Sequence, residues 1–94
     1  MYIVMLHYKV ALDVMDRHRP AHLEWLKQGY EQGMLLASGR QTPPTGGVIL
    51  AHAMPRAELD AYLARDPFKT ADLADYTIVE FAPNLRAPEL SGVE

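Results

Sequence analysis

The sequence has no cysteine, a shortage of positive charge and no long apolar run. Without cysteine, the chain can form neither disulfides nor thiolate metal sites. Its 9 Lys and Arg residues against 12 Asp and Glu give a net charge of −3, whereas phosphate binding normally needs a basic surface. No stretch approaches the roughly 20 apolar residues of a membrane span. These absences argue against nucleic acid and membranes as partners.

The first residues, Met1 to Leu6, lack the basic start and the small-residue cleavage site of a signal peptide. We therefore expect a soluble, cytoplasmic protein. The 94 residues suffice for one small domain, which we place at residues 1–83. Residues 84–94 are rich in Asn, Arg, Pro, Ser and Gly, and they are predicted to form a C-terminal tail.

The small size of the domain also bears on association. A domain of this length buries only about 60–65% of the surface of its unfolded chain, so its core is marginal without a metal, a disulfide or a partner subunit. The first predicted strand, Tyr2–Val10, is apolar on both of its alternating sides, at least as far as His7. A strand of this kind must be covered on both faces, and a second subunit is the simplest cover for one of them.

Apolar periodicity predicts the element order β-α-β-β-α-β. Pro20 is tolerated at the first position of a helix but not in its interior, so the main helix is predicted to begin there, after a short turn at 13–18. Gly33 then ends this helix, and Leu23, Leu26 and Tyr30 form one stripe at helical spacing, with Trp25 and His22 beside it. The remaining elements are predicted to be strands at Met34–Ser38, Val48–Met54 and Tyr76–Ala82, a helix at Arg56–Arg65, and a short turn at Phe68–Leu73.

This order is the split βαβ pattern, which usually forms a four-stranded antiparallel sheet with two helices on one face. The predicted fold is therefore α+β and ferredoxin-like. The other face of the sheet stays open unless it is paired, so we expect a homodimer joined through the sheet faces.

His22 and Asp66 are the strongest candidates for chemistry. If Pro20 begins the helix, His22 lies in its first turn, where the helix dipole favours the neutral imidazole that a general base needs. Asp66 follows the second helix, and the fold can bring these helix ends together. A carboxylate bonded to imidazole fixes its tautomer and stabilises its cationic form. The structural alternatives are a half-buried histidine at a helix end and an aspartate that starts a turn before Pro67.

Other polar groups give weaker signals. Ser38 and Gly39 follow the second strand, where a hydroxyl and a close backbone approach could serve a ligand or simply form a turn. His18 and His22 have the i, i+4 spacing of metal ligands, but Pro20 intervenes and no third ligand stands out, so no metal site is predicted. The cluster Arg17-His18-Arg19 is either a solvated turn or a cradle for an anionic ligand above His22.

Several short segments, taken together and in this order, resemble the YciI-related (YCII) family over roughly residues 2–83. They are Tyr2-Ile3-Val4-Met5-Leu6, His22-Leu23 with Leu26, Gly33, Ala37-Ser38-Gly39, Thr45-Gly46-Gly47-Val48-Ile49-Leu50-Ala51, Asp66-Pro67-Phe68 and Ala74-Asp75-Tyr76.

The resemblance implies a dimeric α+β barrel with two sheets packed face to face. It also implies a site centred on His22 and Asp66, with Ser38 lining the same pocket and Gly39 and Phe68 beside it. Relatives often have proline after the Ser-Gly pair, whereas this chain has Arg40. An arginine there favours a carboxylate or phenolate in the ligand.

The family's best-understood relatives imply proton transfer on small cyclic or aromatic compounds, including dehydrochlorination and lactone-isomerase-like steps. Our hypothesis is a small cofactor-independent enzyme in which His22 transfers the proton and Asp66 orients the ring. The alternative is a dimeric module that binds a small molecule or a partner protein without chemistry. A haem- or oxygen-using monooxygenase of related shape is a weaker option, because no cofactor motif is evident.

Overall fold

The alternating N-terminal segment forms the central strand β1 (Tyr2–Tyr8) in the computed structural model, which describes residues 1–94. Strands β3 (Gly46–Ala51) and β4 (Ala74–Glu80) pair with it on either side, and β2 (Leu35–Arg40) pairs with β3. The sheet order is β2-β3-β1-β4, and every pair is antiparallel. The predicted α+β ferredoxin-like fold is confirmed, although β3 and β4 begin two residues earlier than predicted and β2 one residue later.

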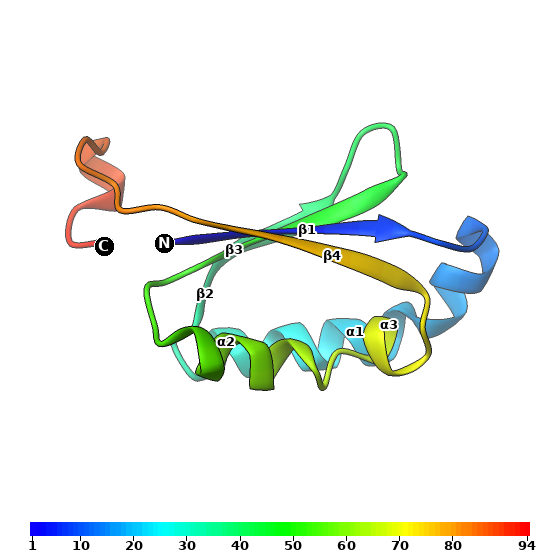
Figure 1. The fold of residues 1–94 in the computed structure, drawn as a ribbon. Coiled ribbons are helices and arrows are strands. Elements are labelled where there is room, and N and C mark those ends of the chain that lie inside the picture. The colour runs from blue at the N-terminus through cyan, green and yellow to red at the C-terminus, as the bar shows by residue number, and fades with distance from the viewer.

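The helices lie together on one side of the sheet (Figure 1). They are α1 (Leu12–Glu31), α2 (Arg56–Leu63) and the short α3 (Pro67–Thr70), which overlaps the first half of the turn predicted at Phe68–Leu73. Proline is well suited to the first helical position, and Asp66 caps the helix by accepting the backbone N–H of Phe68. This short helix matters because it orients the candidate carboxylate.

The prediction that Pro20 begins the main helix is wrong. A single helix of 20 residues runs from Leu12 to Glu31, and Pro20 lies inside it. Proline removes one backbone hydrogen bond, but tertiary packing holds most helices in proteins. Here the buried face of the helix includes residues on both sides of the proline, among them Met15 and Trp25.

The predicted apolar stripe of this helix is only partly buried. Leu23 and Tyr30 are 48% and 41% exposed, and only Leu26 of the three is buried. The face that packs on the sheet consists of Met15, His22, Trp25, Leu26 and Gly29.

Helices α1 and α2 are joined by a reciprocal contact. The indole N–H of Trp25 donates to the carbonyl of Tyr62 at 3.0 Å, and the Tyr62 hydroxyl donates to the carbonyl of Trp25 at 3.1 Å. The two rings stack with centroids 4.3 Å apart. Gly29 permits this approach, because a Cβ atom there would lie 2.2 Å from the Tyr62 hydroxyl. The Trp25–Tyr62 pair holds the end of α2 against α1, and Asp66 follows soon after α2.

The second face of the sheet carries no helix (Figure 1), and most of its side chains are apolar. Side chains alternate along each strand, so the residues that do not face the helices gather here. Along β1, β3 and β4 they are Ile3, Met5, His7, Val48, Leu50, Thr77 and Val79, all half-buried or exposed.

After β4 the chain returns toward the N-terminus, where the Met1 amino group donates to the carbonyl of Phe81 at 2.9 Å. A single 3-10 turn, η1 (Pro88–Leu90), follows, and Val93 is buried. None of the helices combines the length and the apolar character that a membrane crossing requires.

Candidate functional site

His22 projects from the inner face of α1, near the middle of the helix. It is therefore not in the first turn, and the predicted influence of the helix N-terminus does not apply, because the dipole effect falls off within one turn. Its side chain is 11% exposed.

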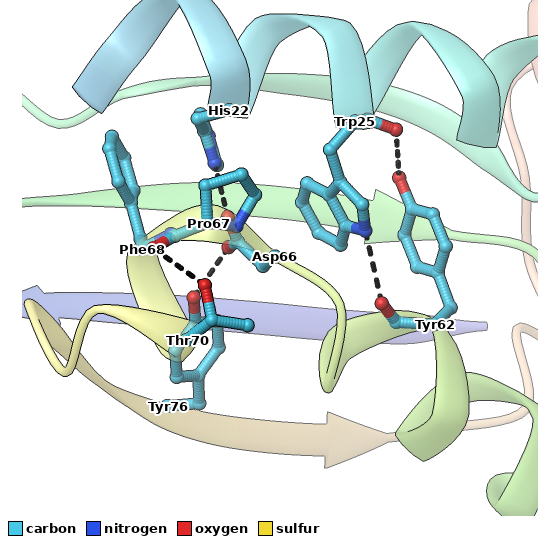
Figure 2. Close-up of polar contacts among 8 residues, drawn as sticks. All are labelled: His22, Trp25, Tyr62, Asp66, Pro67, Phe68, Thr70 and Tyr76. Atoms are coloured by element: carbon cyan, nitrogen blue, oxygen red, sulfur yellow. Dashed lines mark hydrogen bonds and ion pairs between the residues drawn. The ribbon is translucent and has the colours of Figure 1, made fainter.

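Asp66 lies directly opposite His22 and is fully buried (Figure 2). Its Oδ1 atom accepts hydrogen bonds from His22 Nδ1 at 2.7 Å and from the backbone N–H of Phe68 at 3.0 Å. Its Oδ2 atom accepts the hydroxyl of Tyr76 at 2.5 Å. Three donors from α1, α3 and β4 thus converge on one carboxylate, so both of its oxygens have partners and its position is fixed.

This arrangement assigns the histidine tautomer. Because an ionised carboxylate only accepts, Nδ1 of His22 carries a proton, and in the neutral imidazole the lone pair is then on Nε2. Nε2 of His22 has no hydrogen-bond partner in the protein. Every fully buried side-chain nitrogen or oxygen does have one, so Nε2 is accessible to solvent. A neutral imidazole with its Nδ1–H held by a carboxylate is the general-base form.

Two aromatic rings hold the imidazole in place. Phe68 stacks on it with centroids 3.9 Å apart and planes 8° apart, and Trp25 lies at 5.5 Å with a tilt of 33°. Phe68 therefore both donates its backbone N–H to Asp66 and packs on the ring that Asp66 orients.

His22 and Phe68 line a cavity of about 120 Å³ between α1 and the sheet. Its walls are mainly apolar, and Asp66 is not among them, so the carboxylate acts behind the histidine rather than on a ligand. The other lining residues are Leu6, Tyr8, Arg19, Leu23, Leu26, Ser38, Gly39, Arg40, Gly47, Val48 and Ile49. A second hollow adjoins it and shares Arg19, Leu23 and Arg40 with it.

The predicted ligand-binding residues of the second strand all line this cavity. The strand was predicted to end at Ser38, but β2 continues through Gly39 to Arg40. The Ser38 hydroxyl bonds the Tyr30 hydroxyl at 2.8 Å. Arg40 donates to Asp16 at 2.7 Å and lies over the Tyr8 ring. Asp16 raises the pKa of Arg40, which therefore stays charged.

The remaining histidines do not join this site. His7 bonds Thr77 on the open face of the sheet, and His18 and His52 line neither hollow. No three His, Cys, Asp or Glu side chains gather as a metal-binding group.

The family model of the YCII-related domain matches residues 1–82. The chain belongs to the YCII-related domain family. No curated protein matches it. Among solved structures, this YCII-related chain is similar to the 5-chloro-2-hydroxyhydroquinone dehydrochlorinase TftG from Burkholderia phenoliruptrix AC1100, in complex with 2,5-dihydroxybenzoquinone. The TM-score is 0.71 at 18% identity, over 87% of this chain and 94% of that chain, so the likeness shows a shared fold.

Tyr76 is the residue of this YCII-related site that sequence reasoning missed. It was seen only as the start of a strand. The available signal was its alternation with Ile78, which places both side chains on the face toward the helices. A hydroxyl on that face needs a buried partner, and Asp66 is the acidic side chain within reach.

Burial raises the pKa of Tyr76, and the neighbouring charge and hydrogen bond of Asp66 raise it further. Burial is also the main cause of the raised pKa of Tyr62, with a smaller contribution from Asp66. Both hydroxyls therefore stay protonated in the folded protein at a pH where they ionise in the unfolded chain, about 10.

We expect the free energy of unfolding to fall as the pH rises above about 10. A tyrosine whose pKa is higher in the folded protein than in the unfolded chain stabilises the fold fully only at a pH below the pKa of the unfolded chain. Urea unfolding between about pH 8 and 11 measures this slope. The slope should become shallower in Tyr76→Phe and stay the same in Tyr30→Phe, which alters an exposed tyrosine. Equal slopes in wild type and Tyr76→Phe would contradict the assignment.

Proposed function

We propose that this chain is a small cofactor-independent enzyme that performs general acid–base chemistry on a single-ring organic compound. One observation carries the proposal: Asp66 holds Nδ1 of His22 at 2.7 Å, which leaves Nε2 as the basic atom of a residue that lines a cavity. Asp66 is then a positioning residue, and His22 is the catalytic residue.

The size of the cavity supports a single-ring substrate. It measures about 120 Å³, and an engineered apolar cavity of about 150 Å³ binds benzene. Its apolar walls suit a ring, while Ser38 and Arg40 supply polar contacts at one side. Ligand sites generally combine an apolar lining with a few placed polar groups.

The proposed chemistry begins when Nε2 removes a proton from the substrate. The electron pair left behind either expels a leaving group, such as chloride, or takes a proton back at another atom. The first outcome is an elimination and the second an isomerisation. Asp66 balances the charge of the imidazolium that forms. The dehydrochlorinase activity of TftG, which shares this fold, supports elimination as the first reaction to test.

We also infer that the protein works as a homodimer joined through the open sheet face. The apolar residues of that face support this inference, since the exposed apolar patches of monomers are normally small. An antiparallel sheet with an apolar second face has a reason to pair that face.

Turnover on a compound panel tests the proposal. The panel contains 5-chloro-2-hydroxyhydroquinone and related chlorinated single-ring hydroxy and carboxy compounds, followed by chloride release, and lactones followed by hydrogen–deuterium exchange. On any compound turned over, we expect His22→Ala to lose about 10²–10⁴-fold in rate, the contribution of one positioned base. His18→Ala is the matched control, because His18 lies on α1 but lines neither hollow.

A His22→Ala variant that stays within about tenfold of wild type would remove the histidine from the mechanism. The alternative is a binding module without chemistry, and the nearly complete burial of the His22–Asp66 pair, which ties α1 to α3, favours it as the second candidate. Panel compounds that bind in the cavity but are never turned over would decide for this alternative.

A further inference from the structure

We propose that Arg19 makes this site selective for a ring that carries one negative charge, best met by a carboxylate. The inference rests on the proposed function for the identity of the site, and it adds the chemical class of the substrate. Its basis is a count of the charges around the mouth of the cavity.

Arg19 is placed where the two hollows meet. It lines both of them, together with Leu23 and Arg40. On α1 it precedes His22 by three residues, and side chains at that spacing are neighbours with Cβ atoms about 5–6 Å apart. One ring can therefore present an anionic group to Arg19 and a reacting atom to His22.

The charges at the mouth leave one cation unmatched. Arg40 is paired with Asp16 at 2.7 Å, and the side chain of Arg40 is only 24% exposed. The ion pairs of the protein join Lys9 with Asp72 and Asp75, His22 with Asp66, Arg40 with Asp16, and Arg56 with Asp60. Arg19 belongs to none of them. The group Asp16, Arg19 and Arg40 thus has a net charge of one positive unit facing the opening.

The apolar wall of the cavity makes the positive charge of Arg19 selective. Leu6, Leu26 and Ile49 are buried and apolar, and they offer an anion no partner. An anionic group is therefore better placed beside Arg19 than against this apolar wall, and the ring is expected to enter with its apolar side toward Leu6, Leu26 and Ile49. Arginine matches a planar carboxylate with two parallel hydrogen bonds, which adds direction to the attraction.

Benzoate and benzamide test the inference, because they share a ring and differ in charge. Titration followed by protein NMR should show benzoate binding beside His22 more tightly than benzamide. Arg19→Gln should weaken benzoate by about tenfold, the lower end of what a hydrogen bond to a charged group contributes, and should leave benzamide unchanged. Arg17→Gln is the matched control, since Arg17 is exposed and lines neither hollow.

A second variant tests the charge count independently. Asp16→Asn removes the one negative charge at the mouth and frees Arg40, so benzoate should bind about threefold more tightly, in the range of an exposed ion pair. Equal binding of benzoate and benzamide, equal losses in Arg19→Gln and Arg17→Gln, or no benzoate binding beside His22 would each overturn the inference.

These outcomes are separable from those of the proposed function. His22→Ala should lose turnover but keep the preference for benzoate over benzamide, because the charge lies at Arg19. If turnover depends on His22 but benzoate has no advantage, only the anion site is wrong. If benzoate is preferred but turnover ignores His22, only the proposed chemistry is wrong.

Discussion

Replacing Asp66 with asparagine is expected to lower turnover by about 10⁴-fold, the loss seen when the aspartate of a serine-protease triad becomes an amide. The substitution keeps the shape of the side chain but lets an NH₂ group face His22 Nδ1, which lies 2.7 Å away. An amide donor there favours the tautomer with the proton on Nε2. That tautomer cannot accept a proton at Nε2, the atom proposed to act as the base.

The variant should still fold, because with the NH₂ group facing His22 the amide oxygen takes the place of Oδ2 and still accepts the Tyr76 hydroxyl, so only the backbone N–H of Phe68 loses its acceptor. Asp66→Ala is the poorer test, since it leaves three buried donors without a partner, each costing about 1–3 kcal/mol. Thermal unfolding checks that the asparagine variant is folded, and the nitrogen chemical shifts of the His22 ring report its tautomer. Turnover near the wild-type rate with unchanged ring shifts would show that Asp66 is only structural.

The strands and their order were predictable because their side-chain pattern is local. Alternation at Tyr2, Val4 and Leu6 against Ile3 and Met5 sets two faces whatever the rest of the chain does. Asp66-Pro67 likewise gave a local signal for a break after the second helix. The fold class follows from these periodicities and from the short connections between elements.

The course of α1 was not predictable, because it depends on tertiary packing. Pro20 has a strong local preference for a helix start, and only the burial of Met15 on one side and Trp25 on the other shows that the helix continues through it. Because the predicted start of this helix was wrong, the predicted effect of the helix dipole on His22 was wrong as well. The chemistry assigned to the residue is unaffected, because Asp66, rather than the helix end, sets its tautomer.

His22 and Asp66 were predicted to lie close together, but the structure brings them together in a different way. We expected two helix ends to meet, whereas the side of α1 meets the cap of a short helix. Asp66-Pro67 was interpreted only as a break, although Asp followed by Pro is also a helix-start signal, because a helix as short as α3 has almost no periodic pattern to support it. Tyr76 was missed for the related reason that its partner comes from a different element.

The proposed homodimer gives the second large expected effect. We expect the wild-type protein to sediment as two chains, and Leu50→Lys to sediment as one at micromolar concentration. Leu50 lies in β3 on the open face, opposite Ile3 of β1 and Ala37 of β2. In a two-fold dimer the change occurs twice, and each uncompensated buried charge costs about 3–5 kcal/mol.

The lysine should leave the subunit folded, because in a monomer this side chain faces water. Leu50→Met, which conserves volume, should remain dimeric, and so should Ala61→Lys, which adds the same charge on the exposed side of α2. Sedimentation over a range of concentrations, with circular dichroism of each variant, separates dissociation from unfolding. A wild-type protein that stays monomeric at high concentration would contradict the proposed dimer. It would show that the apolar open face is stable in contact with water. The His22 site would be untouched by that result, since its cavity lies on the helix side of the sheet.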